Sequence, residues 1–386
     1  MSWPSSPGVG EPDFGLDLRT VTEIDDFAAL GERWDSLVAR MPRPSPFLLS
    51  TWLIEWWKRF SGRSMLRVVV VGTGGTLSAG IPLMVTKNRG VRVLQILGAP
   101  RTVVVDVVAA SGRGTLPDQV FGEALAGDDY DAVLFSGLSD GSLLDALVRR
   151  GARTLSQAPS PVMDILKPWH DLYMEKTSSK GRNTAKRKLK RLAALGRIDF
   201  RTSTSPAEVS ATLEDCFVVH RLGWSWRHDR SIFGTESGQQ FYRAVTPALA
   251  KQGGISITTL YVDGKPIAFD YCFVVGDTMF LHRLAFDPRY AEHSPGLLTT
   301  LHTIAEGASA GIRRFEFMGG ANAYKVALAD RFEPLVTVSG LPQTATGRLY
   351  SLGLRAEAQA RRRLGNIELA RKFRDRLRSG TLGPHR

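Results

Sequence analysis

The chain has 386 residues and a formal net charge of +12. Its composition, 43% hydrophobic and 23% charged, is that of a globular protein and excludes a mainly disordered chain, while the length favours two domains. No stretch of eighteen uncharged apolar residues is present, which argues against a membrane-spanning helix. Cys216 and Cys272 are too few for a disulfide framework, so a reducing, cytoplasmic location is expected.

The first half of the chain predicts two helices followed by alternating strands and helices. Residues 1–14 are rich in Pro, Ser and Gly and lack a signal-peptide pattern, so we expect a disordered start. Apolar spacings of three and four predict helices, and short apolar runs between glycine turns predict strands. The helices are expected at 24–41, 50–60, 116–126 and 142–150, and the strands at 66–71, 77–85, 91–97, 103–109, 132–135, 153–157 and 162–166.

The second half repeats part of this pattern. Three strands joined by tight turns within 255–286 parallel three strands within 66–97, at an offset of about 188 residues. An offset close to half the chain favours a duplicated α/β unit. The helices of this half are expected at 168–177, 183–195, 207–221, 237–251, 296–310 and 348–377, and its strands at 198–203, 255–262, 266–275, 278–286, 313–318 and 332–339.

The positive charge is confined to two segments. Residues 180–197 carry eight basic and no acidic residues, and residues 347–386 carry eleven basic and three acidic ones, so the rest of the chain is net acidic. The first segment predicts a solvated arm, an RNA-binding surface or a site for an acidic substrate, and its lack of aromatic residues favours an arm or phosphate-contacting surface. The second predicts an amphipathic helix whose Leu352, Leu364 and Phe373 pack on the protein, ahead of contact with an anionic membrane, a partner protein or RNA.

A G-x-S-x-G sequence stands at 137–141, between a predicted strand and a predicted helix. This is the setting of a nucleophile elbow, with Ser139 as the nucleophile. The alternative is a loop in which Asp140 or Ser142 caps the following helix. No histidine stands in a suitable strand-end loop further along, so capping is the favoured interpretation.

The seven histidines and two cysteines lack metal-binding spacing. No two histidines are four residues apart, and there is no C-x-x-C pair. Helical zinc sites and zinc knuckles need those spacings. We therefore expect no metal.

Residues 280–298 contain the pattern of an anion site. A strand leads into a polar loop that contains Arg289. Ser294 at the N-cap, Pro295 at the first helical position and Gly296 then open an apolar helix. The free amides of a first helical turn and the helix dipole attract anions, and a glycine permits close approach. A capped helix without a ligand is the equally weighted alternative.

Several motifs occur in an order that resembles a known enzyme family. They are Trp52-Leu-Ile-Glu-Trp-Trp57, Ala79-Gly-Ile-Pro-Leu83, Leu97-Gly98, Leu192-Ala-Ala-Leu-Gly196, Phe286-Asp-Pro288, Ser294-Pro-Gly296, Phe315-Glu-Phe-Met-Gly-Gly320 and Tyr324-Lys325. Across about residues 25–340 the chain resembles the GNAT-type acyltransferases of the cellulose-biosynthesis (CelD-type) branch, which are related to the FemABX peptidyltransferases.

The resemblance implies an α/β (α+β) fold of two tandem GNAT-like domains, each a mixed twisted sheet flanked by helices. The N-terminal domain would span 15–166 and the C-terminal acyltransferase domain 167–345, with a basic helical arm at 180–197 and a basic tail at 346–386. The implied activity is direct transfer of an acyl group, acetyl above all, from a CoA thioester to an amine. The acceptor would be a small molecule or glycan of polysaccharide or cell-envelope metabolism, and no cofactor would be bound permanently.

Two alternatives remain at this point. FemABX relatives use aminoacyl-tRNA as the donor, so tRNA is a second possible partner. A non-catalytic adaptor that binds RNA or the inner surface of the membrane on a GNAT scaffold is the other. The tight glycine signature of ordinary GNAT enzymes is absent, and Ala321 stands where relatives carry an acid, which favours the non-catalytic adaptor.

The resemblance also implies site residues. The donor would lie against Arg289, Ser294, Gly296 and Leu297. Glu316 is the expected base or amine-binding carboxylate, and Asp270 is the alternative acid. Tyr324 and Lys325 would donate to the leaving thiolate or contact the donor phosphates. His220 and Trp224 would border the acceptor cleft.

Overall fold

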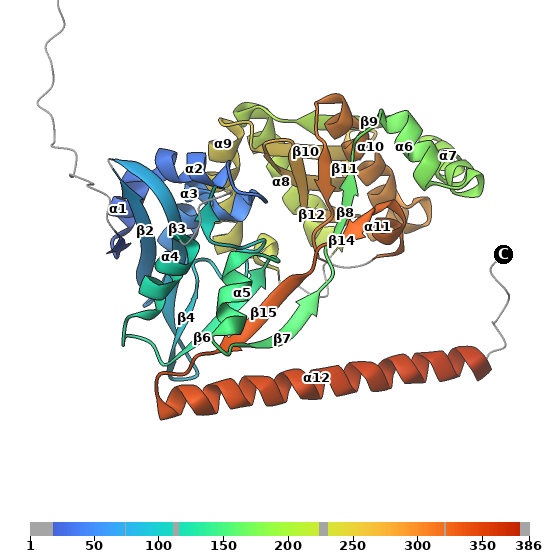
Figure 1. Cartoon of the computed structure of the whole chain (residues 1–386). Helices are drawn as coiled ribbons and strands as arrows, with labels where there is room; N and C mark the ends of the chain where they lie inside the picture. The colour runs from blue at the N-terminus through green and yellow to red at the C-terminus, as the bar shows by residue number, and fades with distance from the viewer. Residues whose placement is uncertain (1–17, 74, 111–115, 224–230, 320–321, 379–386) are drawn as a thin grey trace, which may run out of the picture.

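The computed structural model describes residues 18–73, 75–110, 116–223, 231–319 and 322–378, without the side chains of 116 and 364–378. The expected disordered start at 1–14 and Trp224 lie outside these residues. Two twisted sheets stand side by side, with helices on their faces and one long helix running beneath them (Figure 1). No helix of the described part is long and apolar enough to cross a membrane.

The elements of the first half follow the prediction closely, with two changes. The expected helix at 24–41 is divided in two at Leu30, and the expected strand at 103–109 shrinks to its last two residues. In chain order the elements are β1 (Arg19–Val21), α1 (Ile24–Ala29), α2 (Gly31–Val38), η1 (Pro46–Leu48), α3 (Ser50–Phe60), β2 (Met65–Thr73), β3 (Thr76–Asn88), β4 (Val91–Ile96), β5 (Val108–Ala109), α4 (Leu116–Leu125), β6 (Ala132–Leu138), α5 (Ser142–Arg149), β7 (Arg153–Ala158) and β8 (Pro161–Asp164).

In the second half the structure adds a short helix, α11, and divides the expected strand at 332–339 into two. The elements are α6 (Trp169–Lys176), α7 (Ser179–Ala193), β9 (Ile198–Ser203), α8 (Pro206–Gly223), η3 (Ile232–Gly234), α9 (Glu236–Ala250), β10 (Ile255–Val262), β11 (Lys265–Val275), β12 (Thr278–Phe286), η4 (Pro288–His293), α10 (Pro295–Ser309), β13 (Arg314–Glu316), α11 (Ala323–Leu328), β14 (Arg331–Phe332), β15 (Leu335–Gly340) and α12 (Ala345–Arg378).

The two sheets repeat one arrangement. The first has the order β1-β2-β3-β4-β6-β15-β7, with β5 beside β3, and the second has the order β9-β10-β11-β12-β13-β8-β14. In each path the fourth and fifth strands pair in parallel, β4 with β6 and β12 with β13, while the other described pairs along it are antiparallel. This repetition confirms the duplication expected from the offset of the strand patterns.

The halves exchange one strand each. β15, from the end of the second half, lies between β6 and β7 of the first sheet. β8, from the end of the first half, lies between β13 and β14 of the second sheet. The domain division at residue 166 stays a prediction, but the hydrogen-bonded sheets cross it in both directions.

The G-x-S-x-G segment is a capped helix start, as expected, although the cap comes from elsewhere. The Asp106 carboxylate accepts hydrogen bonds from the Ser142 and Leu143 amides at 3.1 and 2.7 Å, which satisfies the first turn of α5. Ser139 is buried and its Oγ donates to the Val105 carbonyl at 3.1 Å. Asp106 lies in the segment expected as a strand, of which only Val108–Ala109 forms one, as β5.

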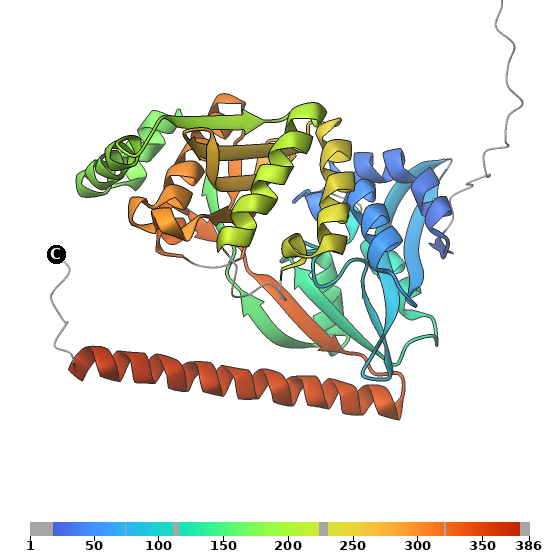
Figure 2. The same ribbon diagram turned by 180° about the vertical axis from the view of Figure 1, so that it is seen from behind.

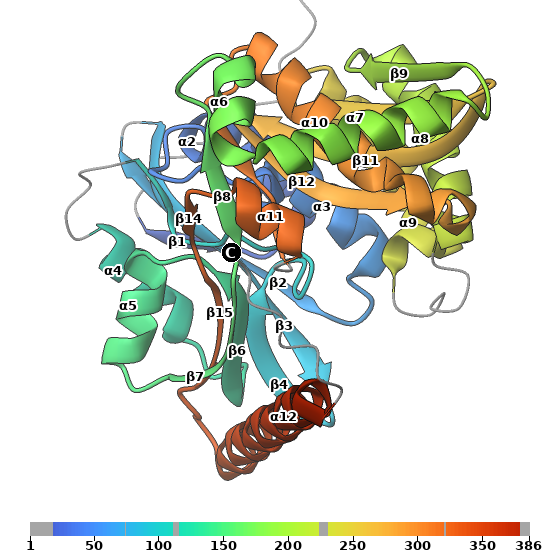
Figure 3. The same ribbon diagram turned by 90° about the vertical axis from the view of Figure 1, so that its right-hand side faces the viewer.

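The long helix α12 packs on the first sheet near its start. Tyr350 is buried against Val91 and Val93 at the edge of β4, in line with the expectation that the tail packs on the protein. The predicted stripe is wrong at Leu352, which is 58% exposed, because the buried face follows Tyr350 instead. Leu364 and Phe373 lie outside the described side chains. The helix is seen end-on beneath the sheets in Figure 3.

Candidate functional site

The second sheet opens where β12 and β13 separate. The two strands pair in parallel over only three residues, from Thr278 and Arg314 to Phe280 and Glu316. Beyond Phe280, β12 continues to Phe286 and keeps its partner β11, so its other edge faces an opening. Backbone N–H groups along such an unpaired edge are free to meet a ligand.

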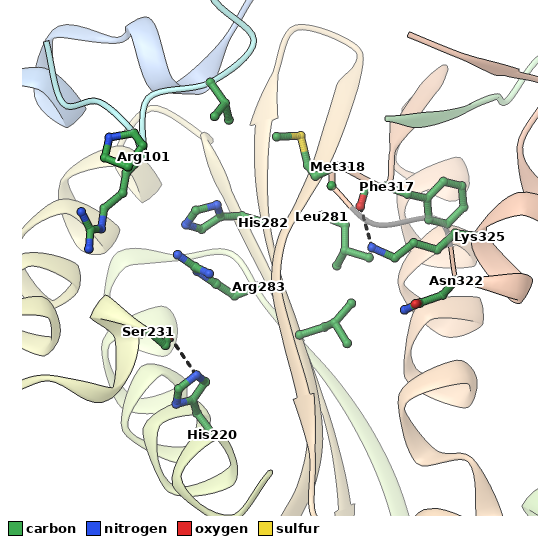
Figure 4. Close-up of a pocket in the computed structure, with 14 residues that line it drawn as sticks. Arg101, His220, Ser231, Leu281, His282, Arg283, Phe317, Met318, Asn322 and Lys325 are labelled. Carbon is green, nitrogen blue, oxygen red and sulfur yellow. Dashed lines mark hydrogen bonds between the residues drawn. The ribbon is translucent and has the colours of Figure 1, made fainter. Parts of the chain in front are cut away.

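A cavity of about 560 Å³ lies at this opening. Pro100, Arg101 and Val103 reach it from the first half, and residues 281–284 and 317–319 line it from the two diverging strands. The polar side chains in its lining are Arg101, His220, Ser231, His282, Arg283, Asn322 and Lys325 (Figure 4). The site is thus built between the halves, the setting in which ligand pockets often occur.

A β-bulge sets the direction of two cavity residues. Tyr271 of β11 is opposite Arg283, whereas the next residue, Cys272, is opposite Leu281, so His282 is the extra residue of β12. A bulge breaks the alternation of side chains along a strand. His282 and Arg283 therefore both project toward the side of the cavity that also receives Arg101 (Figure 4).

His282 stands among aromatic rings contributed by both halves. Its ring centroid is 5.3 Å from Phe47 and 5.7 Å from Trp52 of the first half, and 4.8 Å from Phe273. Its Nε2 is 2.7 Å from the Tyr242 hydroxyl. Burial in this apolar setting lowers the pKa of His282 well below its usual value, and the nearby Arg283 lowers it further. The imidazole is therefore neutral at pH 7 and able to accept a proton.

His220, expected at the acceptor cleft, does line the cavity. It sits near the end of α8, is 5% exposed, and its Nε2 is 3.1 Å from Ser231 Oγ. Its ring also packs on Phe233 at 5.2 Å. The structure thus brings two imidazoles, from α8 and β12, to the same side of one cavity (Figure 4).

Lys325 also lines the cavity, with Asp270 and Tyr324 behind it. Its Nζ donates to the Phe317 carbonyl at 2.8 Å, which satisfies backbone released where the chain leaves β13. Burial lowers the pKa of Lys325, opposed by the Asp270 charge. Asp270 is fully buried, accepts a hydrogen bond from Thr303 Oγ1 at 3.1 Å, and has its pKa raised to about 7 by burial. Burial also raises the pKa of Tyr324.

The expected donor site gains a cation from the basic arm. Ser294 was expected to cap α10, but its backbone is left-handed and its side chain makes no capping hydrogen bond. Its Oγ accepts a hydrogen bond from Lys188 Nζ of α7 instead. Figure 3 shows α7 running in front of α10. The amides of Gly296 and Leu297, in the first turn of α10, thus lie next to an ammonium group, and both features favour anions.

Arg289 and Gly296, two of the residues expected to bind the donor, each contact a neighbouring residue of the protein. The Arg289 guanidinium is held by Asp287, with Nε 2.9 Å from Oδ2, and this arginine lowers the pKa of the Asp287 carboxyl. A Cβ on Gly296 would lie 3.3 Å from the Phe286 ring, tighter than ordinary contact. The close packing at Gly296 accounts for a glycine there with or without a phosphate.

Glu316 does not line the cavity. Its carboxylate is fully buried and accepts hydrogen bonds from Arg43 Nη2 at 2.6 Å and from Arg314 Nη2 at 2.9 Å. Glu333 joins the same cluster through both arginines. Since Arg43 comes from the first half, this network ties the halves together. Both oxygens of Glu316 are engaged, so the geometry gives no support to the expected base role.

Three cavity residues were not predicted from the sequence, whereas Lys188 lies in the basic segment 180–197, for which an arm or phosphate-contacting surface was expected. His282, Arg283 and Arg101 carry no motif that marks them. The one available signal was the sequence Leu281-His-Arg-Leu284, in which two adjacent polar residues interrupt an apolar strand. Such an interruption is typical of a bulge or a functional site.

Comparison with known proteins agrees with this architecture. The acetyltransferase (GNAT) domain family matches residues 179–326, from α7 into α11. FemX is similar over 83% of this chain and 97% of its own, with 12% identity and a TM-score of 0.58. L-PGS from Bacillus licheniformis is similar over 84% and 95%, with 11% identity and a TM-score of 0.53. No curated protein matches the sequence.

A third similar structure is a tandem GNAT protein from the clavulanic acid biosynthesis pathway. It covers 84% of this chain and 98% of its own, with 13% identity and a TM-score of 0.50. At such identities the likeness concerns the fold, and here that fold is the duplicated pair of sheets described above. The chain therefore has a tandem GNAT fold whose second half contains a GNAT acetyltransferase domain, and the protein is an acyltransferase.

Proposed function

We propose that the protein is an acyl-CoA-dependent N-acyltransferase that moves an acyl group directly to an amine. The observation that carries this proposal is the separation of β12 from β13, which opens the cavity between the two halves. An extended acyl donor can add to the unpaired edge of β12 as a further strand would. Its phosphates would meet the first turn of α10 and Lys188.

The chemistry requires one base and one site for a developing oxyanion. We assign the base to His282, because it is neutral and its Nδ1 has no hydrogen-bond partner among the described residues. If the Nε2–H of His282 donates to Tyr242, Nδ1 carries the lone pair. The amine nitrogen then bonds to the acyl carbon, its proton passes to Nδ1, and the bond to the leaving sulfur breaks. Amides on the free edge of β12 would stabilise the oxyanion.

Lys325 is the candidate proton donor to the leaving group. Its ammonium lies in the cavity lining, and its lowered pKa eases proton release. Asp270 would act through Lys325, as a positioning residue behind it, because it does not line the cavity. Tyr324 likewise stands behind Lys325. We give Glu316 no catalytic role, because its carboxylate binds Arg43.

Charge reversal at Lys188 tests the donor site. We expect Lys188→Glu to weaken acetyl-CoA binding at least about tenfold, because it places a carboxylate beside the donor phosphates. Isothermal titration calorimetry with acetyl-CoA measures this. Lys186→Glu on the same helix is the matched control, since Lys186 is exposed while Lys188 is half-buried at Ser294. Equal affinities for the wild type and Lys188→Glu would remove the α10 start from the donor site.

Aminoacyl-tRNA is the second candidate donor, favoured by the exposed basic face of α7. In that case acetyl-CoA would not bind, and tRNA affinity would fall steeply with salt because counterions are released. Lys186→Glu, a control for CoA, would then weaken tRNA binding. The same variant pair thus separates the two donors.

The motif resemblance extends the proposal to the cellulose-biosynthesis branch and to an acceptor in polysaccharide or cell-envelope metabolism. We place the protein in the cytoplasm, where α12 would contact the anionic inner surface of the membrane. This helix exposes Leu349 and Leu352, at 71% and 58%, next to the exposed Arg348, a composition typical of interfacial helices.

Vesicle binding tests that contact. We expect the wild type to sediment with phosphatidylglycerol vesicles, and Leu349→Ser with Leu352→Ser to lower the bound fraction several-fold, because both side chains face away from the sheet. Val148→Ser is the control, because it removes a 50% exposed apolar side chain from α5 instead of α12. If the wild type stays in the supernatant, the membrane contact is wrong.

A further inference from the structure

The cavity that the two halves form has an unbalanced charge. Arg101, Arg283 and Lys325 contribute to its lining, and no Asp or Glu does so among the described residues. The Lys325 ammonium already binds the Phe317 carbonyl. The two arginines have no hydrogen bond or ion pair to another described side chain, and Arg283 Nε is shielded from solvent without a partner.

Three other part-buried arginines among the described residues are paired, whereas Arg355 of α12 also has a shielded Nε without a partner there. Arg67 binds Asp129, and Arg43 and Arg314 both bind Glu316. Leaving a polar group of this kind in a partly closed space without a partner costs free energy. An anionic ligand would supply the counter-charge that Arg101 and Arg283 lack among the described residues.

The donor phosphates are not that anion, because they are expected on the other face of the sheet. Asp270 of β11 contacts Thr303 of α10, whereas its neighbour Tyr271 contacts Thr246 of α9. α10 thus covers one face and α9 the opposite one, as the views from the two sides show (Figures 1 and 2). Arg283 shares the side of His282, whose partner Tyr242 belongs to α9.

We propose that the acceptor carries a carboxylate or phosphate close to its amine, and that Arg283 and Arg101 bind this group while the amine faces His282. The guanidinium fork suits the paired oxygens of either group. The bulge places Arg283 directly after His282 and on the same side, so that acid and amine need to be only a few bonds apart. Arg101 approaches from the first half, so this binding would also engage both halves. The inference rests on the proposed acyl transfer.

Pairs of acceptors that differ only in the acid test it, with acetyl-CoA as the donor. Alanine against alanine methyl ester probes a carboxylate, and glucosamine 6-phosphate against glucosamine probes a phosphate, with rates expressed per free amine. We expect kcat/KM for the acidic member of at least one pair to exceed that of the neutral member at least tenfold. Arg283→Gln should reduce this ratio at least tenfold, and Arg283→Lys should reduce it less.

Arg313→Gln is the matched control, because Arg313 is exposed just before β13, at the strand end away from the cavity, and it should keep the wild-type ratio. A wild-type ratio near one in both pairs would overturn the proposal, and so would an unchanged ratio in Arg283→Gln. A loss of acetyl-CoA affinity in Arg283→Gln would assign the arginines to the donor and also overturn it.

Binding measurements separate this inference from the proposed function. If no amine is acylated, calorimetry with the same four compounds still compares acidic and neutral members. Acidic members that bind no tighter than neutral ones contradict the inference. Absence of acetyl-CoA binding to the wild type instead contradicts the proposed donor and leaves the acid-binding comparison to decide the role of Arg283.

Discussion

Replacing Glu316 by Gln is expected to lower the free energy of unfolding by about 3 kcal/mol, because two guanidinium groups lose a buried counter-charge. The carboxylate is 0% exposed and binds Arg43 and Arg314 at 2.6 and 2.9 Å, so the amide cannot replace its charge. Urea unfolding measures the change. Activity per folded molecule should be retained, which is opposite to what a catalytic base would give.

The controls for this variant follow from the network. Glu175→Gln removes an exposed carboxylate paired with Lys167 and should leave the unfolding curve unchanged. A double-mutant cycle of Arg43→Met with Glu316→Gln isolates the coupling between the halves. If Glu316→Gln folds as stably as the wild type but loses transfer activity, Glu316 is catalytic after all.

Replacing His282 by Gln is expected to lower kcat about 10²–10⁴-fold while acetyl-CoA still binds, because glutamine accepts no proton from the amine. Stopped assays of acyl transfer at saturating donor measure this. Tyr242→Phe is the companion variant, since it keeps the aromatic packing and removes only the hydroxyl 2.7 Å from Nε2. We expect Tyr242→Phe to lose less than His282→Gln. Equal activity of His282→Gln and wild type would pass the base role to His220.

The pH dependence of kcat/KM provides a second measure of His282. The base must be neutral to act, so the rate falls as pH drops through its pKa. Because burial lowers the pKa of His282, the acidic limb should lie below pH 6.5, the usual value for histidine. A limb caused by titration of the acceptor amine shifts with the pKa of that amine, whereas a limb caused by the enzyme does not. Profiles with two acceptors whose amines differ in pKa therefore distinguish the two causes. An enzyme limb above pH 6.5 would contradict this assignment.

Much of the fold was predictable because apolar periodicity is local. The helix at 50–60 and the strands at 255–262 and 278–286 appear with the expected bounds. The exchange of β8 and β15 was not predictable, since strands 161–164 and 335–340 have no local feature that determines which sheet they join. The choice depends on pairing between residues far apart in the chain.

The site was predictable only where one segment carries it. The donor site at the start of α10, expected from Ser294 and Gly296, stays a prediction, while His220 lies at a cavity as expected. The place of His282 in the cavity was not predicted, because it depends on a bulge, which is a property of two paired strands and not of one. The ion pair of Glu316 could not be predicted for a related reason, because its partner Arg43 comes from the other half of the chain.

The reciprocal exchange of β8 and β15 bears on how the chain acquires its fold. As the chain is synthesised, the first sheet lacks the strand between β6 and β7 until residues 335–340 have emerged. Pairing over such sequence separations is slow and leaves strand edges open in the meantime. The N-terminal half therefore cannot complete its fold before the C-terminal half is synthesised, as separate domains usually do. Both sheets are complete only once residues 331–340 have been made, and a chain cut at residue 166 leaves two sheets that each lack a strand.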